Sequence, residues 1–237
     1  MPFDRMLAYC AALREHNDRS WFHENHGQYE EARKDFLALL DQLRYVIAAG
    51  APELADDILY MNARDWVYRI ARDMRYYRDR PPYDPSFRAY ISADRKSWLP
   101  IGYFLCVEPG GTIFGTGMFL EKTSAVNRVR DYIAANQDEW EEILRSGDLT
   151  LEGDRLKTLP RGYAPGHPAE EWLRYKNWLV TFPFPDESLG SFDEFGERIA
   201  ALLPRLEPFR KFLLAAGRSA ESPGPIIPPS QEKDWGW

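Results

Sequence analysis

Cysteine is scarce in this chain, and the two residues that occur lie far apart. Cys10 and Cys106 are the only cysteines among 237 residues, and each stands in an apolar stretch. Small secreted domains that depend on disulfides carry many more, so both side chains are predicted to be buried, reduced thiols. The N-terminus lacks the basic start and apolar core of a signal peptide, and no run approaches the roughly 18 apolar residues of a membrane-spanning helix. The sequence therefore predicts a soluble, cytoplasmic protein that does not enter a membrane.

Positive charge is in deficit, because 30 Lys and Arg face 37 Asp and Glu and the formal net charge is −7. A protein that coats nucleic acid normally needs a basic face. No nucleic-acid partner is therefore predicted, although a local basic pocket remains compatible with this balance.

The common cofactor and nucleophile motifs are missing as well. The glycines around residues 110–117 match neither the G-x-G-x-x-G spacing nor a phosphate-binding loop, and a tight hairpin turn explains them better. No Gly-x-Ser-x-Gly elbow is present. His23 and His26 stand three apart, as metal ligands on a helix can, but no third ligand is nearby and a solvated helix face is the simpler interpretation. We predict no cofactor and no metal site, and whether the protein is an enzyme stays open.

Aromatic residues, by contrast, are abundant, with 8 Trp, 13 Tyr and 13 Phe. Together with β-branched residues they form short runs between turn signals, which predicts strands. Four such runs follow one another without helical crossovers, and Pro109-Gly110-Gly111 joins the last two across a short loop. An antiparallel meander is therefore predicted, with strands over residues 66–71, 87–93, 101–108 and 112–119. A further strand over residues 178–182 and a short hairpin over residues 149–156 are also predicted.

Apolar residues recur at helical spacing on both sides of these strands. The periodicity predicts helices over residues 3–15, 21–47, 123–145, 168–175 and 191–214. Gly27 is expected to break the second helix, and Pro204 and Pro208 to interrupt the last. Beyond Gly217 the composition turns to Ser, Pro and Gly, which is typical of an extended tail. The sequence thus predicts an α+β fold in a single domain over residues 1–216, with the sheet flanked by helices. A Pro-rich tail over residues 217–237 could bind a protein partner or a second copy of the chain.

The most distinctive stretch runs from Arg72 to Tyr83, where four arginines and two aspartates share nine positions ahead of a Pro-Pro corner. Guanidinium groups donate paired hydrogen bonds that suit carboxylates and phosphates, so Arg72 and Arg75 are candidate ligands for an anion. In this interpretation Asp73, Asp79 and Tyr83 orient the arginines. In the alternative, the aspartates pair with the arginines only to fasten the loop.

A second candidate lies between Arg161 and His167. Arg161 could supply another guanidinium, and His167 could act as a general acid or base beside a bound anion, because imidazole titrates near neutral pH. His167 also precedes Pro168-Ala-Glu-Glu, which suits the first turn of a helix. It could therefore be no more than the residue at a helix start.

Four blocks of sequence stand out together, in this order along the chain. They are Asn17-x-Arg19-x-Trp21-Phe22, Arg69-Ile-x-Arg72-Asp73-x-Arg75-Tyr76-x-x-Asp79-x-x-Pro82-Tyr83, Tyr103-Phe-Leu-x-Val-Glu-Pro109-Gly-Gly, and Pro160-Arg161-Gly-Tyr163 with His167-Pro168. Jointly they resemble an uncharacterised family, domain of unknown function 2461. The resemblance implies a single α+β domain and no particular activity, because the family has none established. The chain departs from the family's pattern at Tyr77, Arg80, Pro81 and Asp84, where the family usually has Ser, Lys, Thr and Lys.

Two hypotheses follow from these residues. The first is an intracellular protein that binds a small anionic ligand, possibly a phosphorylated one, in an arginine-rich cleft formed by Arg72, Arg75 and Arg161. The second is a non-catalytic protein-interaction module, in which the Arg/Asp network is purely structural.

Overall fold

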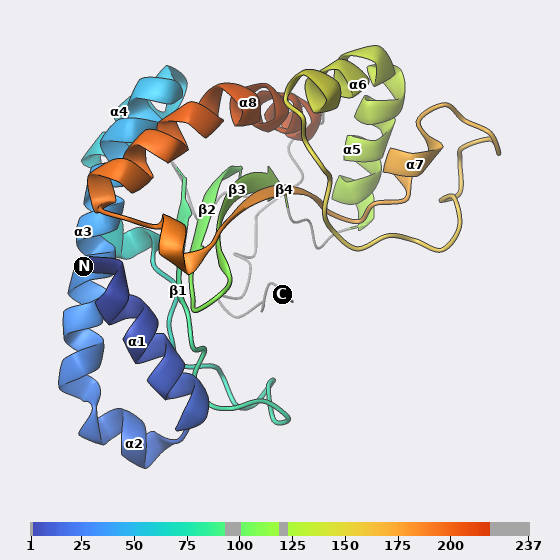
Figure 1. The fold of residues 1–237 in the computed structure, drawn as a ribbon. Helices are drawn as coiled ribbons and strands as arrows, with labels where there is room; N and C mark the ends of the chain where they lie inside the picture. Colours follow the sequence, from blue (N-terminus) through green and yellow to red (C-terminus); the bar gives the residue numbers. More distant parts are fainter. Residues whose placement is uncertain (1, 93–100, 119–122, 219–237) are drawn as a thin grey trace.

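A four-stranded antiparallel sheet stands between two groups of helices in the computed structural model, which describes residues 2–92, 101–118 and 123–218 (Figure 1). The strands are β1 (Phe87–Ile91), β2 (Gly102–Val107), β3 (Thr112–Met118) and β4 (Trp178–Phe184), and they pair in that order. Each neighbouring pair is antiparallel. The predicted α+β class with a meander sheet is therefore confirmed.

One face of the sheet carries the core. Residues that stand opposite one another across the strands share a face, and Leu105 pairs with Ala89 on one side and Phe114 on the other. All three are fully buried, as are Tyr103 and Trp178 on the same face. The buried apolar side chains form one cluster that reaches from Phe3 to Ala216.

Glycine allows β3 and β4 to approach each other closely. A Cβ atom at Gly115 would lie 2.1 Å from the carbonyl oxygen of Val180, and one at Gly117 would lie 2.4 Å from that of Trp178. No side chain fits at such distances, so both positions require glycine.

The strand predicted over residues 66–71 is wrong. Residues Ala63–Trp66 form a short 3-10 helix, because the Asn62 side chain accepts a hydrogen bond from the amide of Arg64 and starts a turn. Beyond it, Val67 makes one isolated bridge to Ala89 instead of a continuous ladder. The fourth strand of the meander is β4, which follows β3 only after three intervening helices.

Four helices precede the sheet: α1 (Pro2–Glu15), α2 (Arg19–Glu24), α3 (His26–Gly50) and α4 (Pro52–Tyr60). The Asp18 carboxylate accepts a hydrogen bond from the amide of Trp21 and caps α2. The break falls at Asn25, two residues before the predicted position at Gly27, which lies inside α3. Helix α4 was not predicted. It begins with Pro52 at the first helical position, where proline needs no amide hydrogen.

The helices between β3 and β4 differ from the prediction in where they begin and end. The helix expected over residues 123–145 is divided at Asn136 into α5 (Thr123–Ala135) and α6 (Gln137–Ser146). The division occurs here because the side-chain amide of Asn136 donates a hydrogen bond back to the carbonyl of Tyr132. Helix α7 (Glu170–Leu173) is shorter than expected. The hairpin predicted over residues 149–156 is absent. In its place, Glu152 bridges Leu179 and Arg155 bridges Tyr175.

Helix α8 (Phe192–Arg218) passes through Pro204 and Pro208 without interruption. Both prolines lie in a helix whose apolar side is buried along its length, and this packing outweighs the two lost amide hydrogen bonds. The helix crosses the molecule from the α3–α4 side to the α5–α6 side (Figure 1). It also includes the first two residues of the predicted tail, the rest of which lies outside the described residues. None of the described helices is both long and apolar enough to span a membrane.

Candidate functional site

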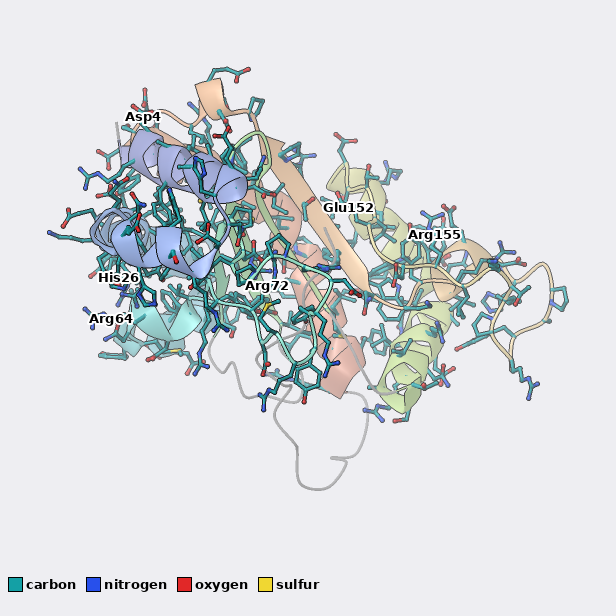
Figure 2. All side chains as sticks on the ribbon, turned by 90° about the horizontal axis from the view of Figure 1, so that it is seen from below. Asp4, His26, Arg64, Arg72, Glu152 and Arg155 are labelled. Atoms are coloured by element: carbon teal, nitrogen blue, oxygen red, sulfur yellow. The ribbon has the colours of Figure 1, made fainter. Side chains whose placement is uncertain are left out.

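The segment from Arg72 to Tyr83, which we call the arginine–tyrosine loop, is closed at its base by backbone hydrogen bonds. The amide of Arg72 donates to the carbonyl of Pro82, and the amide of Asp84 donates to the carbonyl of Ile70, each at 2.8 Å. The two ends of the loop therefore lie side by side, just before β1. Figure 2 shows Arg72 at this base.

The Arg72 guanidinium is turned back onto the base of its own loop. Its Nη1 donates to the carbonyl oxygens of Pro81 at 3.1 Å and Tyr83 at 2.7 Å, and its Nη2 lies 3.3 Å from Oδ2 of Asp84. Burial lowers the pKa of Arg72, whereas the Asp84 charge raises it. Because protein acceptors occupy both terminal nitrogens and only 15% of the side chain is exposed, little of this guanidinium is left for a ligand.

Asp84 is a buried carboxylate on which two arginines converge. Its Oδ2 lies 2.6 Å from Nη2 of Arg88 as well as 3.3 Å from Arg72, and its Oδ1 accepts the hydroxyl hydrogen of Ser86 at 2.7 Å. Asp84 is 7% exposed. Loss of this carboxylate would leave two largely buried positive charges without their shared acidic partner.

Asn17, in the turn between α1 and α2, fastens the other side of the base. Its side-chain amide pairs with both backbone groups of Tyr83, and each of the two hydrogen bonds measures 3.0 Å. The Tyr83 ring stacks on Phe22 of α2, with the ring centres 4.1 Å apart and the planes 11° from parallel. Tyr83 is therefore part of the packing between the loop and the first helices.

The tip of the loop, residues 75–80, is exposed. The Arg75 side chain is 79% exposed, although its Nε donates to the Asp73 carboxylate at 2.9 Å. The Tyr76 ring is 73% exposed, and the Arg75 guanidinium lies 5.7 Å from its centre. The pair is uneven, because the Asp73 side chain is only 12% exposed whereas most of the Arg75 side chain lies in solvent.

Two further arginines belong to the tip. Arg78 is exposed and makes no hydrogen bond, ion pair or ring contact with any residue that the structure describes. Arg80 is exposed and its guanidinium lies 5.8 Å from the centre of the Tyr77 ring. Asp79 between them is exposed and forms no ion pair within the described ranges. The tip therefore carries more positive than negative charge.

The loop that carries Arg161 lies elsewhere, projecting beyond α5 and α7 (Figure 1). Arg161 is exposed. His167 accepts a hydrogen bond at Nδ1 from the amide of Ala169 at 3.0 Å, and its ring packs edge-on against Tyr163. This contact places the imidazole before α7, which begins three residues later at Glu170. The structure thus brings Arg72, Arg75, Asp73 and Tyr83 into one loop, and Arg161 and His167 into another.

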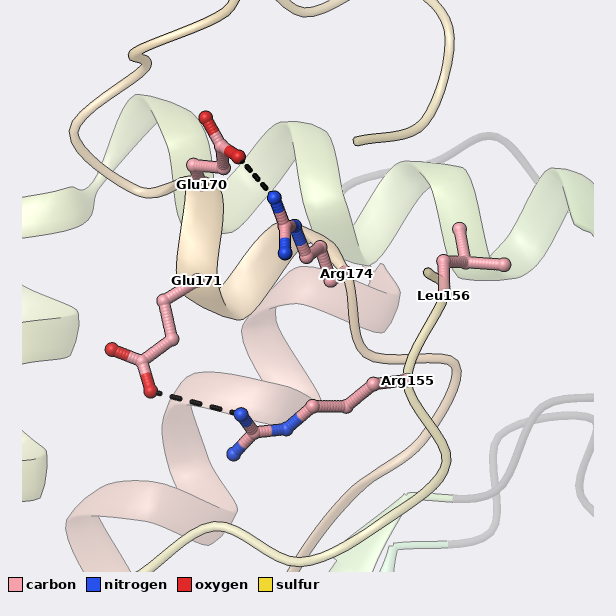
Figure 3. Close-up of a pocket in the computed structure, with 5 residues that line it drawn as sticks. All are labelled: Arg155, Leu156, Glu170, Glu171 and Arg174. Atoms are coloured by element: carbon pink, nitrogen blue, oxygen red, sulfur yellow. Dashed lines mark hydrogen bonds and ion pairs between the residues drawn. The ribbon is translucent and has the colours of Figure 1, made fainter. Parts of the chain in front are cut away.

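An open cleft of about 400 Å³ lies beside α7 (Figure 3). It is lined by Arg155, Leu156, Glu170, Glu171 and Arg174. Two acid–arginine pairs face it: Glu170 bonds to Arg174, and Glu171 lies 3.9 Å from Arg155. The backbone amide of Gly166 and the Arg174 charge hold the pKa of Glu170 below its usual range.

The sequence interpretation missed this cleft and its neighbour Arg130. Arg155 and Arg174 are surrounded by other charged residues and give no distinctive pattern. Arg130, however, lies four residues after Val126 and three before Ile133, on the apolar face of α5. An arginine at such a position was a usable signal, because charged side chains are almost never buried without a partner.

No metal centre appears in the parts of the chain that the structure describes, because no three His, Cys, Asp or Glu side chains meet closely enough to hold an ion. Cys10 and Cys106 are both buried, and neither forms a disulfide. Burial raises the pKa of the Cys106 thiol to about 12, and the nearby Glu108 charge adds to the rise. Neither thiol is placed to act as a nucleophile at neutral pH.

Comparison with known proteins gives one match. The profile of a family described as "Conserved hypothetical protein (DUF2461)" matches residues 5–212. No curated protein and no solved structure shows significant similarity to the chain. The matched region includes the arginine–tyrosine loop, the whole sheet and the cleft beside α7.

Proposed function

We propose that this chain, which belongs to the family called domain of unknown function 2461, binds an acidic segment of a partner protein through the tip of its arginine–tyrosine loop. One observation carries the proposal. The base of the loop is fixed by protein contacts, whereas Arg75 and Tyr76 at the tip are 79% and 73% exposed.

The chemistry of the tip suits a protein partner. Arginine and tyrosine are enriched among the residues that dominate the binding energy of interfaces, because each combines a large contact area with directed hydrogen bonds. The anchored base reduces the entropy lost when the tip is ordered against a partner. A segment that is rigid at its ends and rich in exposed Arg and Tyr therefore favours binding.

Charge selects an acidic partner. Guanidinium groups bind carboxylates through paired hydrogen bonds, and Arg75, Arg78 and Arg80 place three exposed guanidinium groups within six residues. The chain as a whole carries a net charge of −7, which repels a polyanion such as nucleic acid over longer distances. A short acidic peptide can reach the tip without approaching the rest of the surface. The proposal also places the protein in the cytoplasm, because its two thiols are buried and form no disulfide.

A small anion held jointly by Arg72, Arg75 and Arg161 has less support. The terminal nitrogens of Arg72 already bond to protein acceptors. Arg161 belongs to the loop beyond α7, on a separate part of the molecule (Figure 1). The predicted tail could add a second contact with a partner or with another copy of the chain, and it too belongs to this proposal.

Binding of a fluorescein-labelled oligoglutamate peptide, followed by fluorescence anisotropy, tests the proposal. We expect the wild type to bind it with an affinity that falls as salt is added, because the contacts are exposed ion pairs. The triple variant Arg75→Gln/Arg78→Gln/Arg80→Gln should lose at least about ten-fold in affinity, which corresponds to roughly 1.4 kcal/mol. Its melting temperature should change little.

The matched control is Arg145→Gln on α6, an arginine that is 76% exposed and paired with Glu142. This variant should bind the peptide as the wild type does. The proposal fails if the triple variant binds equally well, if Arg145→Gln weakens binding to the same extent, or if duplex DNA of similar charge binds as tightly as the peptide.

A further inference from the structure

Two arginines are buried within the described residues, and they differ in whether a carboxylate pairs with them. Arg210 is 0% exposed and pairs with two carboxylates, those of Glu207 and Glu53. Arg130 is 4% exposed, and no carboxylate of the described residues lies within ion-pair distance of it. A buried positive charge without an acidic partner is unfavourable, so the contrast between the two sites calls for a physical reason.

The contacts of Arg130 are all with neutral groups. Its Nη2 donates to the carbonyl oxygen of Tyr175 at 2.8 Å, its Nη1 donates to Oδ1 of Asn127 at 2.9 Å, and its Nε has no hydrogen-bond partner. The adjacent Asp131 is engaged with the hydroxyl of Tyr163 at 2.5 Å. Burial lowers the pKa of Arg130, since the neutral contacts do little to offset its desolvation.

Arg130 does not line the cleft beside α7 but is connected to its wall through the backbone. The carbonyl that it binds belongs to Tyr175, and the preceding residue, Arg174, lines the cleft. Arg155 lines the cleft too, and its guanidinium lies 4.3 Å from the centre of the Tyr175 ring. Arg155 and Arg174 therefore line the open volume, and both Arg155 and Arg130 contact the residue that follows Arg174, Tyr175.

The acids of the cleft leave room for a ligand anion. Two glutamates and two arginines line it, so their charges balance. Arg130 adds one further positive charge behind the wall, at the Tyr175 carbonyl. Arg155 and Glu171 are 51% and 67% exposed and 3.9 Å apart, so this pair is weak and can open. Arg174 also has a buried Nε without a hydrogen-bond partner.

We infer that the cleft beside α7 binds a small molecule that carries a carboxylate or a phosphate group. Arg155 and Arg174 make the direct contacts, and Arg130 supplies the neighbouring charge that makes the site attract anions. The volume of about 400 Å³ lies within the range of small-molecule sites. The ligand releases Arg155 from Glu171 and brings a negative charge toward Arg130, which has no acidic partner among the described residues.

The test is a thermal-shift panel on the full-length protein, with every salt matched in ionic strength by sodium chloride. The probes are succinate, citrate, inorganic phosphate and glycerol phosphate. A ligand that binds only the folded state raises the melting temperature by mass action, and we expect at least one of these anions to do so. Whether the carboxylates or the phosphates act distinguishes the two sources of negative charge.

Three variants assign any shift to the cleft. Arg155→Gln should lower the apparent affinity for the anion at least ten-fold. Glu171→Gln should strengthen binding, because Glu171 then no longer competes with the ligand for Arg155. Arg130→Met should remove the shift while leaving the melting temperature without ligand unchanged or higher, because an uncompensated buried charge is gone. The control Arg145→Gln should behave as the wild type.

The inference is overturned if no anion in the panel stabilises the protein beyond the chloride control. It is equally overturned if Arg155→Gln keeps the full shift, or if Arg130→Met melts at a lower temperature and retains the shift. The loop-tip triple variant must keep the anion response, and Arg155→Gln must keep oligoglutamate binding. These cross-checks separate the cleft from the function proposed for the loop.

Discussion

The side chain of Asn17 pairs with both backbone groups of Tyr83: its Oδ1 accepts from the amide and its Nδ2 donates to the carbonyl, each at 3.0 Å. A residue in the turn after α1 therefore fixes the end of a loop that lies 66 positions later in the chain. The arrangement makes the loop base part of the folded core and leaves the tip outside it.

Replacement of Asn17 by Ala should lower the free energy of unfolding by about 1–3 kcal/mol, because a partly buried backbone amide loses its hydrogen-bond acceptor. The Tyr83 carbonyl would keep its contact with Arg72. Urea unfolding followed by circular dichroism measures the effect. Gln137→Ala is the control, since it removes an exposed amide from α6. If Asn17→Ala had the same free energy of unfolding as the wild type, Asn17 would not anchor the end of the loop.

Asp84→Asn should be more severe than Asn17→Ala. The substitution leaves Arg72 and Arg88 without their shared carboxylate, and breaking a buried ion pair in this way costs about 3–5 kcal/mol. Guanidinium chloride unfolding measures the loss. The comparison is Glu142→Gln, which removes the acid of an exposed pair on α6 and should change stability by less than about 1 kcal/mol. Equal effects of the two variants would show that the network at the loop base is not structural.

Two glycines with opposite surroundings give a paired prediction. Gly115→Ala should destabilise the protein by about 1–3 kcal/mol or more, because its Cβ would meet the Val180 carbonyl oxygen at 2.1 Å and push β3 from β4. Gly27→Ala, with no atom within 4 Å of the added carbon, should be neutral or stabilising by up to about 1 kcal/mol through helix propensity. The melting temperatures of the two variants test this prediction. A Gly115→Ala variant that melts at the wild-type temperature would contradict the close approach of β3 and β4.

Glu108 should make stability depend on pH in a stated direction. Burial raises the pKa of this carboxyl, Arg14 works against the rise, and the charge of Asp84 adds to it. The folded state thus holds the proton more tightly than the unfolded state. The stabilising contribution is complete below the usual value of 4.5 and is lost as the pH rises through the folded-state value.

Urea unfolding at acid and neutral pH, in the wild type and in Glu108→Gln, measures this contribution. The stability of the wild type relative to the variant should fall as the pH rises, because only the wild type ionises at this position. The exposed Glu139→Gln on α6 serves as the control. If the stability of the wild type relative to Glu108→Gln instead increased as the pH rises, the predicted direction would be contradicted.

The sequence supports the fold better than the details of the site. The Pro109-Gly110-Gly111 turn and the aromatic runs beside it predict the hairpin correctly, because turn chemistry and strand composition are local. The segment 66–71 has the same texture but lies at the edge of the sheet, where its pairing depends on a distant partner, Ala89. Likewise, whether Pro204 and Pro208 interrupt α8 depends on the packing of its buried face, which no local pattern gives.

The site shows the same division. Composition alone locates the arginine–tyrosine loop. It does not tell which guanidiniums are taken up internally, because that depends on Asn17 and Asp84, and their partners become neighbours only in the fold. The cleft beside α7 is assembled from separate segments around residues 155 and 174, so its arginines carry no shared sequence signal.

The central claim is that the exposed tip of the loop, and not its base, is the binding surface. Hydrogen–deuterium exchange read by mass spectrometry, with and without oligoglutamate peptide, tests it most directly. We predict that exchange slows on addition of the peptide in fragments that cover residues 75–80, with no change around residue 84. Slowing that is absent from the tip, or that appears only elsewhere in the chain, would contradict the account.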